Sequence, residues 1–138
     1  MSKLLVSLLA AGGIAFAGSS FAATGTMSKD AYNAQKSEIK TQYDSDVAGC
    51  KSMSGNAKDV CVKEAKAGEV RGKADAKADK VAAVSSNDAA KKTMDARKDA
   101  SEDKRDADYK VAAERCDSMA GDAKDQCVKA AKTHFGKS

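Results

Sequence analysis

The sequence predicts an all-α protein made of two antiparallel helical hairpins, about four helices in all, each closed by a disulfide. The chain contains no proline, and alanine and lysine, which are strong helix formers, are abundant. All four cysteines fall within two copies of one short pattern. Large apolar residues are sparse, so we expect a thin, alanine-rich core with little or no β-structure.

The first 22 residues have the features of a secretory signal peptide. Lys3 provides a positive start, a short apolar run follows, and Ser20 and Ala22 are the small residues of a cleavage site. An uncleaved membrane anchor is the alternative, which the short length of the run disfavours. We expect cleavage near Ala22 and a periplasmic or secreted chain with no stable membrane span.

An internal repeat organises the rest of the chain. Residues 50–66 and 116–132 are identical at 12 of 17 positions, at an offset of 66. This predicts two units, residues 23–84 and residues 85–138, of which the second is cut short. The break between them falls at residues 85–88, where Ser86 or Asn87 can cap a helix.

An apolar stripe predicts the first helix of the first unit. Its members recur every three or four residues and share one helix face: Ile39, Tyr43, Val47 and Cys50. Gly55 suits the left-handed turn that follows a helix end, and Asn56 is expected to cap the next helix. Gly121 and Asp122 hold the equivalent positions in the second unit.

The second arm of the first unit carries small residues on one face: Ala57, Cys61, Ala65, Gly68, Gly72 and Ala76. Such a face allows a close approach to the first helix, although each glycine costs about 1 kcal/mol relative to alanine. Close packing and a frayed or bent segment are two open interpretations of Gly68 and Gly72. We expect residues 73–80, KADAKADK, to be a solvated surface because their like charges lie four apart.

The third helix is predicted to run to about Met119 with a thin apolar face, namely Met94, Tyr109, Val111 or Ala112, and Cys116. A short fourth helix is expected from Ala123 to about His134, the only histidine, which we expect to be exposed.

The position of the turns predicts the disulfide pairing. Cys50 and Cys61 lie at equal distances from the turn at residues 55–56, so they face each other on antiparallel arms, near the roughly 5.5 Å that a disulfide needs. Four cysteines allow three pairings, and this register favours Cys50–Cys61 and Cys116–Cys127. In the chain-entropy model each bond contributes about 2–3 kcal/mol.

Several function classes are disfavoured. The net charge is only +4 with both signs interspersed, so we expect no nucleic-acid binding. Ten residues separate the cysteines of each pair, unlike the C-x-x-C of thiol redox proteins. Converging thiolates or histidines for a metal, and motifs of catalysis or phosphate binding, are missing. We therefore predict no enzyme, no cofactor and no metal.

The pattern C-x-S-M-x-G-x-A-K-D-x-C-V-K-x-A-K resembles that of small exported proteins of Gram-negative bacteria with GNAKDVC-type units, sometimes labelled cell-envelope or Tol-like. The resemblance covers the signal and both cysteine units. It implies a periplasmic, envelope- or stress-related role and no site residues. Our leading hypothesis is a non-enzymatic periplasmic protein that acts through its surfaces on an unknown envelope or periplasmic partner. A small chaperone-like module is the alternative, and the oligomeric state stays open.

Overall fold

A computed structural model of the chain describes residues 27–84 and 88–137. The predicted signal peptide and the capping residues Ser86 and Asn87 lie outside this part. The described residues form four α-helices and one short 3-10 turn and contain no strand, which confirms the all-α prediction. The elements are α1 (Lys29–Gly49), η1 (Cys50–Ser52), α2 (Gly55–Ala82), α3 (Ala89–Cys116) and α4 (Gly121–Phe135).

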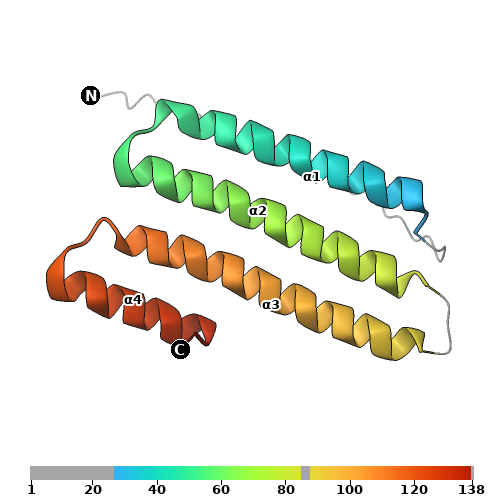
Figure 1. Cartoon of the computed structure of the whole chain (residues 1–138). Coiled ribbons are helices and arrows are strands. Elements are labelled where there is room, and N and C mark those ends of the chain that lie inside the picture. Colours follow the sequence, from blue (N-terminus) through green and yellow to red (C-terminus); the bar gives the residue numbers. More distant parts are fainter. Residues whose placement is uncertain (1–26, 85–87, 138) are drawn as a thin grey trace, which may run out of the picture.

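The four helices lie side by side in a single layer, in chain order, with each antiparallel to the next (Figure 1). In the described part of the chain, α1 contacts α2 but neither α3 nor α4, and α4 contacts only α3. The most extensive interface joins α2 to α3, which come from different copies of the repeat. The two predicted hairpins therefore pack against each other along their inner arms.

Local signals explain most of the helix ends. Ser28 caps α1, because its side-chain oxygen accepts a hydrogen bond from the backbone N–H of Ala31 at 3.0 Å. Gly55 and Gly121 adopt the left-handed conformation predicted for them, with φ of 58° and 56°. The left-handed Gly136 follows the end of α4.

The predicted caps at Asn56 and Asp122 are wrong. Helix α2 begins at Gly55 and helix α4 at Gly121, so the capping positions fall on Ser54 and Ala120, neither of which makes a side-chain cap hydrogen bond. Asn56 and Asp122 instead lie in the first turns of their helices. The side chain of Asn56 is therefore free to bond outside its own hairpin.

Small residues fill the interface between α2 and α3. One cluster comprises Ala74, Ala78, Ala96 and Ala100 with Val81 packed against it, and a second comprises Ala67, Ala107 and Val111 with Val70. Residues of each helix recur at intervals of three, four or seven, as in an antiparallel coiled coil, and their small size lets the backbones approach closely.

Two predictions about core residues were wrong. Met94, expected on the apolar face of the third helix, is 72% exposed, and alanines take its place in the core. The KADAKADK stretch was expected to be solvated, but Ala74, Ala76 and Ala78 are at most 6% exposed. The reason is that α2 is an inner helix with α1 on one side and α3 on the other, so within residues 73–80 only the lysines and aspartates reach solvent.

The structure distinguishes the two glycines of α2. A Cβ atom on Gly72 would lie 3.0 Å from Cγ1 of Ile39 and 3.2 Å from its Cδ1, whereas a Cβ on Gly68 would meet nothing within 4 Å. Gly72 therefore allows close packing against α1, which is the first of the two interpretations given for these glycines. No contact explains why position 68 is a glycine.

These two glycines give a matched pair of substitutions. Gly68→Ala should stabilise the protein by about 0.5–1 kcal/mol, because alanine is the better helix former and the space is open. In Gly72→Ala this gain is opposed by overpacking against Ile39, which typically costs about 1–3 kcal/mol. Urea unfolding should rank Gly72→Ala at least about 1 kcal/mol below Gly68→Ala. Equal stability of the two variants would contradict the close packing.

Candidate functional site

Both disulfides form with the predicted partners. Cys50 bonds to Cys61 and Cys116 to Cys127, and the Cα atoms are 5.7 Å apart in each pair. One sulfur of each pair is enclosed, since Cys50 and Cys116 are both 1% exposed. Each bond joins the end of one helix, directly after α1 at Cys50 or at the last residue of α3, to the second turn of the next helix and so closes the tip of its hairpin.

The two closed tips lie at the same end of the layer, because α2 begins beside the point where α3 ends (Figure 1). Polar contacts join them. The side-chain N–H of Asn56 donates to the backbone oxygen of Glu114 at 2.9 Å, and Arg115 pairs with Glu64 at 2.5 Å. Lys63 pairs with the Glu114 carboxylate at 3.5 Å. Sequence reasoning placed Asn56 at the tip but missed this link between the two copies.

Each tip exposes a methionine at the same position of the repeat. Met53 is 45% exposed and Met119 is 46% exposed, and they are 66 residues apart, the offset of the repeat. We did not predict a role for either residue. The sequence does contain a signal for them: both copies of the repeat keep a large apolar residue within the turn, where a side chain has no core to fill. We refer to Met53, Met119 and the turns around them as the paired tips.

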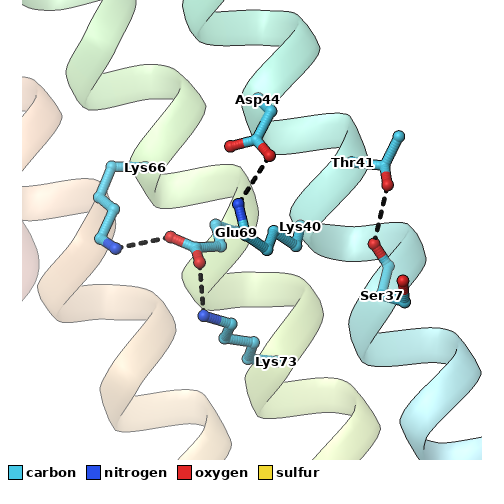
Figure 2. Close-up of polar contacts among 7 residues, drawn as sticks. All are labelled: Ser37, Lys40, Thr41, Asp44, Lys66, Glu69 and Lys73. Atoms are coloured by element: carbon cyan, nitrogen blue, oxygen red, sulfur yellow. Dashed lines mark hydrogen bonds and ion pairs between the residues drawn. The ribbon is translucent and has the colours of Figure 1, made fainter.

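A buried carboxylate lies farther along α2, where Glu69 contacts two lysines of the same helix (Figure 2). The side chain of Glu69 is 7% exposed and accepts hydrogen bonds from Lys66, at 2.6 Å, and from Lys73. These contacts, with Lys66 first and Lys73 second, hold the pKa of Glu69 below its usual range, against the opposing effect of burial. Lys66 also lies 5.3 Å from the ring centroid of Tyr43 on α1.

In the second copy of the repeat, an uncharged aromatic residue occupies the position of Glu69. At the repeat offset, Glu69 corresponds to Phe135, whose ring packs edge-on against Tyr109 with centroids 6.4 Å apart. His134, exposed as expected, lies beside Phe135 at 4.7 Å between ring centroids. The ionic cluster in the first hairpin is thus a structural counterpart of an aromatic pair in the second.

Within residues 27–84 and 88–137, no three histidine, cysteine or acidic side chains gather in a way that would hold a metal ion. None of the helices described combines the length and the hydrophobicity needed to cross a bilayer. No protein-family model, curated protein or solved structure matches the chain.

Loss of one disulfide should loosen one edge of the layer. In Cys50→Ser/Cys61→Ser, helix α1 is held by α2 alone, so we expect stability to fall by about 2–3 kcal/mol and amide exchange to accelerate mainly across residues 29–49. Exchange along α3 should change little. The matched variant Cys116→Ser/Cys127→Ser should move the effect to α4. Equal acceleration in all four helices in both variants would contradict this.

The Glu69 cluster predicts a pH dependence of stability. Because the folded-state pKa of Glu69 lies below the unfolded value of about 4.3, its contribution is complete above that pH and is lost as the pH falls through the folded-state pKa. Glu69→Gln should lower the free energy of unfolding by about 1–2 kcal/mol at pH 7, and the deficit should shrink below about pH 4.

The control is Glu38→Gln, which changes the same group at an exposed position of α1. This variant should differ from the wild type by less than about 0.5 kcal/mol at either pH. A Glu69→Gln deficit that is the same at pH 7 and pH 3 would show that the loss is one of packing and not of charge.

Proposed function

We propose that this protein is a non-enzymatic binding protein of the periplasm that docks onto an envelope or periplasmic protein through the paired tips. One observation carries the proposal: the repeated motif places two equivalent exposed methionines at the same end of the helical layer, next to contacts that hold the two copies together. A single tip could serve as an ordinary turn. Two equivalent tips at one end of the layer form a duplicated surface.

The chemistry of the paired tips suits protein binding. Methionine is flexible and polarisable, so it adapts to apolar partner surfaces of different shapes. The disulfides hold both turns rigid before a partner arrives, which reduces the ordering that binding requires. Two equivalent contacts on one rigid end also act together, because the second forms at high effective concentration once the first is made.

Three features support a periplasmic location. The predicted signal peptide directs export, and disulfides persist in oxidising compartments outside the cytoplasm. The resemblance to exported envelope proteins agrees with both. Intact-mass measurement of protein from the periplasmic fraction should find residues 23–138 with four oxidised cysteines.

A chaperone-like function is the second candidate, and the exposure of Met53, Met94 and Met119 favours it. On this hypothesis the methionines bind many unfolded clients weakly and do not select one partner. A thiol redox function is less favoured, because Cys50 and Cys116 are almost completely enclosed. Suppression of the aggregation of an unrelated client protein would support the chaperone.

Site-specific crosslinking in cells tests the docking proposal. A photoreactive residue is introduced at position 53, 119 or 94 in separate variants, where Met94 on α3 is the more exposed control away from the tips. We expect adducts of the same protein from positions 53 and 119 and not from 94. The docking proposal would be contradicted by adducts from position 94 alone, or by positions 53 and 119 crosslinking to different proteins. Met53→Ser/Met119→Ser should abolish the adduct made from a probe elsewhere at the tips.

A further inference from the structure

An open groove of ≈ 450 Å³ lies at the end of the layer opposite the paired tips. It is bounded by the start of α1, the end of α2 and the first turn of α3. Its volume falls within the range of about 300–1,000 Å³ typical of small-molecule sites. Its exposed surface is mainly apolar, from Tyr32, Val81, Val84 and Ala89. Val84 is 53% exposed and so offers apolar surface that the described part of the fold does not cover.

The charged residues that line this groove are all basic: Lys77, Lys80 and Lys92. The Nζ atom of Lys80 lies 4.3 Å from the ring centroid of Tyr32, which holds this ammonium beside the apolar wall. Lys77 makes one long contact, 3.6 Å, with the exposed Asp99. In the described part of the chain, no carboxylate comes within ion-pairing distance of Lys80 or Lys92, although Asp88 and Asp95 lie one turn either side of Lys92.

Another groove, near the paired tips, shows the contrast. It has a similar volume, ≈ 490 Å³, and lies between α2, α3 and α4. Its four charged residues already pair with one another, Arg71 with Asp108 and Arg115 with Glu64. Charge is balanced there, whereas the first groove combines apolar walls with three positive groups and no acid in its lining. The first turn of α3 adds the positive end of a helix dipole at Ala89.

We propose that this groove binds a single-chain anionic amphiphile, with a carboxylate head at the lysines and an apolar chain along Tyr32, Val81 and Val84. Lys80 and Lys92 would provide the charge-assisted contacts to the head. The apolar walls would remove the chain from water. The site lies away from the paired tips, so it goes beyond the proposed docking function and does not depend on it.

The test uses residues 23–138 with both disulfides formed and octanoate as the probe, below its micelle concentration. Residue-resolved NMR of backbone amides follows the titration. We expect shifts concentrated at Val84, Ala89 and Lys92 with a dissociation constant on the order of millimolar, since the ligand has about ten non-hydrogen atoms. Acetate, which lacks the chain, and 1-octanol, which lacks the charge, should each bind at least about tenfold more weakly.

Variants separate the two parts of the site. Lys80→Gln/Lys92→Gln should weaken octanoate binding at least about fivefold, and Val84→Ser about threefold, through loss of the charged and apolar contacts respectively. All three positions are exposed, so circular dichroism should show an unchanged fold. The control is Lys91→Gln, which removes one positive charge from the residue next to Lys92, outside the groove lining, and should change binding less than about 1.5-fold.

The proposal is overturned by any of three results. The first is no amide shift at the groove at ten times the expected dissociation constant, or shifts centred elsewhere. The second is equal affinity for octanoate and octanol, which would remove the role of the lysines. The third is an equal loss in the Lys91→Gln control, which would show that only the overall charge attracts the ligand.

Discussion

The interface between α2 and α3 is the interaction on which the rest of the molecule depends. The other contacts between α-helices of residues 27–84 and 88–137 are made at an outer edge, by α1 on α2 or by α4 on α3. The α2–α3 interface consists mainly of alanine, which buries little surface for each residue but allows a close approach over many turns. Because these two helices come from different copies of the repeat, their pairing turns two hairpins into one layer.

A single layer also explains why the hairpins need their disulfides. Each outer helix packs against only one other α-helix in the described structure. The interfaces contain few large side chains, so they bury little apolar surface. A covalent bond at the tip limits the freedom of the unfolded chain and so compensates for this limited burial. The two hairpins then differ in detail, with a Glu69–lysine cluster in one and a Tyr109–Phe135 pair in the other.

The antiparallel pairing of α2 with α3 gives the two ends of the layer different chemistry. At one end it aligns the two cysteine tips and their methionines, linked through Asn56 and Glu114. At the other end it leaves α1, α2 and α3 around an apolar groove bordered by lysines. Exposed methionines at one end and a groove lined by lysines at the other suit different ligands, which is why we assign a protein to the first and a small anion to the second.

The sequence by itself determined the helical class, the turns at Gly55 and Gly121 and both disulfide pairings, because these depend on propensity, φ and spacing along neighbouring arms. Only the tertiary structure decided which alanines are buried. In an alanine- and lysine-rich helix, several faces look alike until a neighbour covers one, so Ala76 became core and Met94 remained exposed. The meeting of the two tips and the lysine groove likewise depend on how α2 pairs with α3, a contact between distant segments that no local pattern encodes.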